Sequence, residues 1–421
     1  MKKTLLLFSF LGLLSSVVLA QENNIVEVKI EGLKKTKKSF LINYLETKSK
    51  TPLDSVIIQK DVQRLIRLPA ISHAVFSIQQ ISETECSVVF TVEENRTIIP
   101  VVNFWTTTNK EFAYKVGVYD FNFLGKNITM GGFYQNNGYN SYGLTFKSPY
   151  LFSNKLGMSV NHQNWTSEEP LYFDNGSALY KYNNISLELM GLYEINFRHN
   201  VEFGVNFFKE KYNYKSGLTG VGIPIELDVN KLLFKFVHQY NNLSYHYQYI
   251  SGFKNEFYAQ AVTSKNKHQD EFFIAWNDLF YFRRIGDKGN WANRLRVGLS
   301  SNKKSPFAPF ALDNNVNLRG VGILVDRGTG SIVYNTEYRH TLYEKSWFVL
   351  QGNAFVDAGS WRNPGGNLDD FFKEKNVKVY SGFGLRFINK KVFNAIFRID
   401  YGFGLTKDSA KGLVFGIGQY F

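Results

Sequence analysis

The sequence contains one cysteine, Cys86, among 421 residues. A single cysteine cannot form an internal disulfide and cannot supply a cysteine-based zinc or iron–sulfur site. Proline is also scarce, with 9 residues, which excludes a proline-rich linker protein. Charged residues make up only 20% of the chain, whereas aromatic residues make up 16%, too many for a disordered protein. With a mean hydropathy of −0.23, this composition indicates many short strands that alternate apolar and polar residues.

Long apolar runs are missing after residue 20. The N-terminus has a basic start over Met1–Lys3, an apolar run over Leu5–Leu14, and small or modest residues over Val18–Ala20. This order is typical of a bacterial secretory signal. The apolar run is shorter than the ~20 residues that a membrane-spanning helix needs. We expect residues 1–20 to be a signal peptide and the mature chain to be either an exported soluble protein or a β-barrel.

Catalytic motifs are also missing. The 7 histidines are scattered, and the sequence has no H-E-x-x-H, G-x-S-x-G or G-x-x-x-x-G-K-[ST] motif. We therefore expect no enzymatic activity, no cofactor and no metal site. The formal net charge of +13 does not indicate nucleic-acid binding, because an exported protein has little access to nucleic acid. We assign the charge to loops, to the N-terminal segment and to a polar barrel interior.

Residues 24–95 have the pattern of a small α/β module. The apolar spacing predicts strands and helices in the order β-α-α-β-β. The strands are expected over residues 25–30, 74–78 and 87–93, and the helices over residues 40–45 and 54–68. Asp54 is a suitable cap for the second helix, and Pro69 follows its end. The buried stripe of that helix is expected to be Val56, Ile57, Val62, Leu65 and Ile66.

Residues 96–421 alternate apolar and polar residues without any helical pattern. Tyr245, Tyr247 and Tyr249, for example, alternate with His246 and Gln248. An aromatic or aliphatic face opposite a charged or glycine face, sustained over this length, is typical of a membrane β-barrel with a wet interior. At about 20 residues per strand, turns and loops included, this part of the chain predicts roughly 16 antiparallel strands, with 14 as the alternative.

The segment over residues 24–95 resembles a POTRA domain, the periplasmic module of outer-membrane assembly and transport proteins. The resemblance is carried by Val28–Gly32, Ile71–Phe76 and Phe90–Glu94. These match a strand with a hydrophobic-x-Gly, the region of an F-x-x-V pattern, and a last strand that closes with V-x-E. Ile71 stands where the pattern has phenylalanine.

Residues 96–421 contain local patterns similar to the surface-antigen-type barrel of the BamA/TamA-like superfamily of outer-membrane assembly and translocation proteins. In family order they are Asp120–Lys126 (D-x-N-x-x-G), Ser148–Phe152 (D-P-x-x-F), Asn317–Gly320 (V-R-G-F/Y), Glu337–Arg339 (E-x-R), Phe355–Gly359 (F-x-D-x-G) and Gly384–Phe387. The sequence departs from the family with Ser148 for aspartate, Leu318 for valine and Val321 for the aromatic residue.

The resemblance places Leu318, Arg319 and Gly320 on a long loop that folds back into the barrel lumen. Inside a partly dry lumen the guanidinium needs carboxylate partners, because an unpaired buried charge is costly. Glu337 and Asp357 lie on the polar phase of their strands and should both point inward. We therefore expect Arg319 to pair with them. The alternative is an exposed Arg319 and two solvated acids in the lumen.

The C-terminal segment also has a recognisable pattern. Residues 412–421 alternate and end in Phe421, like the closing strand of bacterial outer-membrane proteins. We expect this strand to pair with a first strand near Phe112–Asn122. Gly412, Gly416 and Gly418 weaken its packing, because glycine gives a strand no side chain to pack. The resulting seam should open at low cost.

The resemblance implies an outer-membrane protein with its N-terminal module in the periplasm. It would act in assembly and insertion of outer-membrane proteins or in translocation, through substrate capture at the POTRA module and a lateral seam in the barrel. Its partners would be unfolded outer-membrane or secreted polypeptides, the lipid bilayer, and accessory periplasmic or lipoprotein subunits. The alternatives are a two-partner-type secretion pore for an exported polypeptide and a passive porin-like channel.

Overall fold

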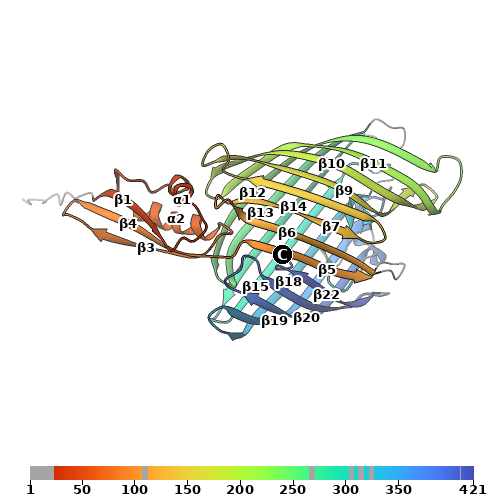
Figure 1. The fold of residues 1–421 in the computed structure, drawn as a ribbon. Helices are drawn as coiled ribbons and strands as arrows, with labels where there is room; N and C mark the ends of the chain where they lie inside the picture. Colours follow the sequence, from red (N-terminus) through yellow and green to blue (C-terminus); the bar gives the residue numbers. More distant parts are fainter. Residues whose placement is uncertain are drawn as a thin grey trace, which may run out of the picture.

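The computed structural model describes residues 23–106, 112–264, 271–302, 308–311, 317–321, 327–407 and 409–421. The signal peptide expected at residues 1–20 lies outside this range. A small module with two helices stands at one end of a large barrel of tilted strands (Figure 1). No helix in the described ranges is long and apolar enough to cross a membrane.

The N-terminal module is an α+β unit built on a four-stranded sheet. Its elements are β1 (Asn24–Glu31), α1 (Lys38–Tyr44), β2 (Thr51–Pro52), α2 (Ser55–Ile66), β3 (Ile71–Gln80) and β4 (Glu85–Glu94). The sheet order is β2-β1-β4-β3, in which β1 and β4 are parallel. The observed order agrees with the predicted one except for the two-residue strand β2. Its core includes Leu41, Ile58 and Phe90, together with the fully buried thiol of Cys86.

Helix α2 begins as expected and buries part of the predicted stripe. The Asp54 side chain accepts hydrogen bonds from the backbone amides of Val56 and Ile57, at 2.7 and 3.2 Å, which satisfies amides that have no partner within the helix. The predicted stripe is wrong at Val56, which is 74% exposed. Leu65 is buried as predicted, and Val62 and Ile66 pack against the module core. Asp61 and Arg64 are also buried, because Asp61 accepts hydrogen bonds from the backbone amides of Glu46 and Thr47 and Arg64 contacts Glu194 of the barrel.

The barrel is a single antiparallel sheet of 16 strands in the described residues, the number that the sequence predicted. Its strands are β5 (Ile98–Thr106), β6 (Phe112–Phe123), β7 (Ile128–Asn136), β8 (Asn140–Ser148), β9 (Leu156–Phe173), β10 (Gly176–Asn196), β11 (His199–Gly217), β12 (Glu226–His246), β13 (Tyr249–Ser264), β14 (Phe272–Ile285), β15 (Gly289–Ser300), β18 (Gly330–Glu344), β19 (Phe348–Arg362), β20 (Val377–Asn389), β21 (Ile396–Gly404) and β22 (Lys411–Ile417). Between β15 and β18 the short strands β16 (Phe310–Ala311) and β17 (Arg327–Gly328) pair with each other, and the 3-10 helices η1 (Leu368–Phe372) and η2 (Glu374–Asn376) follow β19.

Two predictions about the ends of the sheet are wrong. The first strand is β5, whereas the predicted first strand near Phe112–Asn122 corresponds to β6. β5 contains Pro100, and an edge strand tolerates proline because one row of its backbone groups has no ladder partner. The last strand ends at Ile417 and does not continue to Phe421. Gly418 has a φ of +86°, which lets the chain leave the sheet there.

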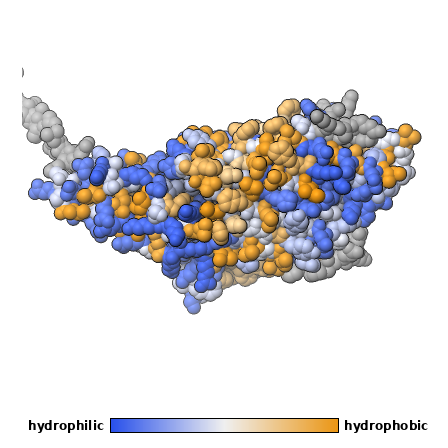
Figure 2. Space-filling view, turned by 45° about the horizontal axis from the view of Figure 1, so that its top comes forward, coloured by the Kyte–Doolittle hydropathy of each residue, from blue (hydrophilic) through white to orange (hydrophobic). Residues whose placement is uncertain are grey.

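The outer surface of the barrel has the expected apolar face. Phe203, Phe383 and Phe415 project outward and are 61%, 63% and 58% exposed. Hydrophobic residues gather around the middle of the barrel, and hydrophilic residues are concentrated on the module and toward the far end of the barrel (Figure 2). Along β18 the opposite phase includes Glu337, Arg339 and Thr341, which are buried within the barrel.

The barrel wall is uneven in height. Strands β9 to β12 have between 18 and 21 residues. The two strands at the ends of the sheet are much shorter, with 9 residues in β5 and 7 in β22. The short strands therefore stand together where the sheet begins and ends.

Candidate functional site

The loop that precedes β18 enters the lumen and rests against β21. Leu318 is fully buried with Val333, Trp361 and Tyr380. Gly320 has a φ of +98°, and a Cβ atom there would lie 2.8 Å from the backbone carbonyl carbon of Gly402. This approach is possible only without a side chain. The expected position of the loop within the lumen is therefore observed for the described residues 317–321.

Arg319 contacts both carboxylates that the sequence assigned to it. Its Nε and Nη2 atoms each donate to Asp357, both at 2.8 Å, and its backbone amide donates to Asp357 Oδ2 at 3.0 Å. Its Nη1 atom pairs with Glu337. All three side chains have no exposed surface. The guanidinium carbon also lies 3.6 Å from the ring centroid of Phe355, which adds a cation–π contact.

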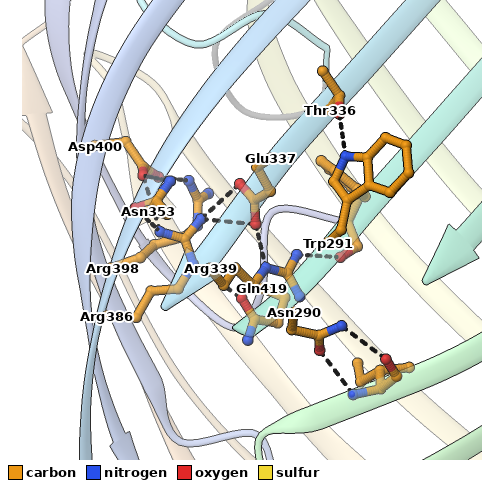
Figure 3. A network of polar contacts seen from close by, with 12 residues as sticks. Asn290, Trp291, Thr336, Glu337, Arg339, Asn353, Arg386, Arg398, Asp400 and Gln419 are labelled. Atoms are coloured by element: carbon orange, nitrogen blue, oxygen red, sulfur yellow. Dashed lines mark hydrogen bonds and ion pairs between the residues drawn. The ribbon is translucent and has the colours of Figure 1, made fainter. Parts of the chain in front are cut away.

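These pairs belong to a larger network of buried charges. Arg386 donates to Glu337 at 3.0 Å and to Asp400 at 3.1 Å, and Arg339 also pairs with Glu337. Arg398 donates to Asp400 at 3.2 Å. Figure 3 shows these side chains pointing toward one another inside the barrel wall. Arginine suits such a site because its planar fork can hold two carboxylates at once.

The residues after β22 turn into this network. Gln419 Oε1 accepts a hydrogen bond from Arg386 at 3.1 Å. The ring of Tyr420 lies 4.5 Å from the guanidinium carbon of Arg319 and 4.8 Å from that of Arg398. The carbonyl of Phe421 accepts from Arg339 at 3.3 Å, and its ring packs against a cluster on β12, β14 and β15. The C-terminal segment thus reaches inward across the lumen.

Sequence reasoning found the centre of the network and missed its periphery. The sequence analysis named Arg386 only as part of a motif. It did not predict that Asp400, Arg398 and Tyr420 belong to the network. Asp400 and Arg398 do lie on the inward phase of a strand that is otherwise apolar or glycine-rich, so the signal that identified Glu337 could also have found them. The inward turn of Tyr420 has no such signal.

The expected pairing of the last strand with the first strand is wrong, and the ends of the barrel sheet instead leave an open seam. In the described residues no backbone ladder joins β5 to β22, and the sheet simply begins at one and ends at the other. Gly412 and Gly416 lie within β22, and Gly418 follows its end. A Cβ atom at Gly412 would have no neighbour within 4 Å.

A short contact joins the two sides of the seam at the module end of the barrel. The Arg96 amide donates to the Lys391 carbonyl at 2.9 Å, and the Phe393 amide donates to the Arg96 carbonyl at 3.0 Å. The rings of Phe121 and Phe393 lie 5.0 Å apart beside this contact. We call these four residues the clasp. The clasp joins the segment before β5 to the turn between β20 and β21.

The module contacts several turns at the same end of the barrel. Arg64 donates to Glu194 at 2.6 Å, and Tyr150 donates to the other oxygen of Glu194 at 3.0 Å. Arg67 donates to the Phe197 carbonyl at 2.7 Å. Burial raises the pKa of Tyr150 well above its usual value, so the phenol stays neutral and keeps donating to the carboxylate. The module is therefore held on the barrel by buried polar contacts.

One edge of the module sheet has no neighbouring strand in the described residues. Strand β3 is 10 residues long and pairs only with β4. Val75 and Ile78 on this strand are 47% and 39% exposed. At the opposite edge lies β2, which has only 2 residues and contains Pro52. Strand β3 is thus the long exposed edge of this sheet.

Comparison with known proteins gives structural matches only. No protein-family model and no curated protein sequence matches the chain. Among solved structures, BamA from Haemophilus ducreyi lacking POTRA domains 1–3 is 15% identical, with a TM-score of 0.56 over 93% of this chain and 83% of that chain. CdiB from Escherichia coli is 11% identical, with a TM-score of 0.61 over 94% and 75%. CdiB from Acinetobacter baumannii is 12% identical, with a TM-score of 0.58 over 94% and 73%. The chain therefore has the fold that BamA and CdiB share, which the sequence motifs predicted.

Proposed function

We propose that this protein is an outer-membrane assembly factor that inserts polypeptides through its seam. The observation that carries this proposal is the absence of a backbone ladder between β5 and β22 in the described residues. Within lipid, unpaired backbone N–H and C=O groups are costly, so a β-barrel normally closes completely. An edge left open offers those groups to an incoming strand.

The short strands beside the seam support the same role. A membrane-spanning strand needs about 9 to 11 residues, and β22 has 7. The apolar wall is therefore lower at the seam than at β9 to β12. A low wall would thin the bilayer beside the seam, which lowers the barrier for a new strand to enter the membrane.

We assign the N-terminal module as a POTRA module in the periplasm that captures the substrate. Its exposed edge β3 can accept an extended chain by strand addition, in which main-chain hydrogen bonds provide the affinity. Backbone pairing makes few demands on sequence, which suits a factor that handles several clients. The Arg64–Glu194 contact keeps this edge on the same side of the barrel as the clasp.

A disulfide across the seam tests the insertion proposal. The test pairs one cysteine at Val101 or Asn103 in β5 with one at Gly412 or Val414 in β22. The native Cys86 is fully buried and does not interfere. In proteoliposomes, we expect the oxidised protein to stop accelerating the folding of a urea-unfolded eight-stranded barrel, and reduction to restore it. A matched pair placed within β9 and β10 should have no effect. Full activity with a locked seam would contradict the proposal.

A two-partner-type secretion pore, the alternative that the family resemblance implies, is the second candidate. The TM-scores of 0.56 for BamA and of 0.61 and 0.58 for the two CdiB structures do not separate the two candidates. A pore would thread an exported chain through the lumen, which requires displacement of Tyr420 and the Arg319 loop. Single-channel conductance that rises when Tyr420–Phe421 is deleted, with insertion activity absent, would favour secretion. The buried network inside the lumen counts against a passive porin.

A further inference from the structure

The outward side chains of β10, β11 and β12 form rows across the three strands, because cross-strand partners lie at the same level of the sheet. The last fully apolar row consists of Leu187, Phe207 and Leu232. The next row consists of Ile185, Lys209 and Asn230, and the row after it of Asn183, Lys211 and Asp228. The outer wall therefore changes from apolar to polar within two rows, and Lys209 and Lys211 lie where it changes.

The length of the apolar stretch places this change at a boundary of the membrane. From Leu187 to Ile195 the outward positions of β10 are occupied by Leu, Leu, Gly, Tyr and Ile. A membrane-spanning strand needs about 9 to 11 residues, and this stretch is long enough to cross the membrane. Tyr193 lies near its other end, and tyrosine prefers the level where lipid meets water. Lys209 and Lys211 therefore lie at the level of the lipid headgroups on the opposite boundary.

This boundary is the one away from the module. Arg64 of the module contacts Glu194, which lies beside the turn between β10 and β11. Lys209 and Lys211 lie toward the other end of β11. The two lysines are therefore placed in the leaflet that the module does not approach.

Both ammonium groups are accessible from outside the barrel. The side chains of Lys209 and Lys211 are 44% and 48% exposed, and their Nζ atoms lie 3.2 and 3.9 Å from the same Asp228 Oδ2. An exposed ion pair contributes little to stability. Asp228 therefore mainly keeps the two ammonium groups close to each other, with much of their surface available to a further anion.

We propose that Lys209 and Lys211 bind the phosphate of an anionic lipid in the leaflet away from the module. An ammonium group is a compact charge with three donors, which suits phosphate oxygens. The alkyl stems would lie on the apolar wall while the charged ends reach the headgroups. Charge complementarity and the level of the two lysines favour lipid as the occupant, because this wall faces the bilayer. The proposal does not depend on the insertion activity proposed above.

A reporter beside the two lysines tests this binding directly. Phe207→Cys, in the last apolar row, is labelled with bimane, and the native Cys86 is fully buried, so only the introduced thiol reacts. The full chain is reconstituted in phosphatidylcholine nanodiscs that contain brominated phosphatidylglycerol or brominated phosphatidylcholine, whose bromines quench the label on contact. We expect phosphatidylglycerol to be preferred about fivefold at this reporter. Tyr193→Cys, at the module end of the same wall, should be quenched equally by both lipids.

Charge variants identify the groups responsible. Lys209→Gln/Lys211→Gln should remove the preference for phosphatidylglycerol, whereas Lys209→Arg/Lys211→Arg should keep it because both cations are retained. Lys181→Gln/Lys215→Gln is the matched control, since these two lysines of the same wall lie against the ring of Tyr139, and it should leave the preference unchanged. Heat-modifiable gel mobility shows that each variant is folded.

Three results would overturn the proposal. The first is a preference that survives Lys209→Gln/Lys211→Gln. The second is an equal preference at the two reporters, which would indicate attraction to the whole protein and not to this site. The third is an equal loss in the Lys181→Gln/Lys215→Gln control, which would indicate an effect of total charge.

Discussion

Two neighbouring parts of the barrel are held together in opposite ways. From β18 to β21, backbone ladders are supplemented by buried guanidinium–carboxylate pairs centred on Arg319 and Glu337. One strand farther, β22 has no ladder to β5 in the described residues, and the nearest link is the clasp at Arg96. The difference suggests that side chains position an edge that the backbone leaves unpaired. The strand insertion that we propose would use this edge, which is held in place while its backbone groups are unpaired.

The largest expected effect comes from Arg319→Ala, which removes the central cation of the network. Glu337 and Asp357 would keep their buried charges with one partner fewer, and breaking a buried pair costs about 3–5 kcal/mol. We expect the urea midpoint of barrel unfolding to fall accordingly. Asp357→Ala and the double variant complete a mutant cycle, in which coupling is expected because the two side chains are in contact. Fully additive losses would contradict the contact, and Arg319→Lys tests whether the planar fork is required.

A smaller loss is expected from Gly320→Ala. Its φ of +98° and the 2.8 Å approach to Gly402 leave no room for a methyl group. A residue forced into such a conformation costs of order 1–3 kcal/mol. The thermal midpoint should fall while the charges of the network are all retained, so this variant separates loop placement from ion pairing. Unchanged stability would show that the loop has another position available.

The clasp is expected to contribute less than the network. Phe393→Ala removes the ring that faces Phe121 at 5.0 Å, and an aromatic pair is worth about 0.5–1.5 kcal/mol beyond its buried area. Global unfolding should change little, whereas amide exchange at residues 96–98 should accelerate. Phe397→Ala, on the outer face of β21, is the matched control. Equal acceleration in both variants would argue against a specific clasp.

The smallest effect is expected at the seam strand itself. Gly412→Ala adds a methyl group where no atom lies within 4 Å, and a glycine-to-alanine change at a compatible position stabilises by about 0.4–1 kcal/mol. A loss of stability would mean that the space beside Gly412 is filled, contrary to the structure. Gly320→Ala and Gly412→Ala each add one methyl group, the first in the charged network and the second at the seam. Their effects on stability can therefore be compared directly.

Much of this architecture could be predicted from residue patterns. Period-two alternation identified the barrel, and the length of residues 96–421 predicted its strand number. The inward phase of Glu337 and Asp357 identified the partners of Arg319. The edges were harder. β5 contains Pro100, which is unusual within a strand, and it was not predicted as the first strand. Residues 412–421 alternate throughout, so no sequence pattern indicated that the chain turns inward at Gly418. Arg64 and Glu194 are far apart in the sequence. No local sequence pattern predicts that a charged residue of α2 is buried against a turn of the barrel.

The clasp also has a mechanical consequence. Only Asn95, Arg96 and Thr97 separate the last strand of the module from the first strand of the barrel, and the middle residue is bonded to the turn before β21. The module, the first strand and the far side of the seam therefore meet at Arg96, in addition to the contacts that Arg64 and Arg67 make with other turns. If β3 takes up a chain as proposed, part of the resulting force would pass through Arg96 to the turn before β21, and so to the side of the barrel where the sheet is open.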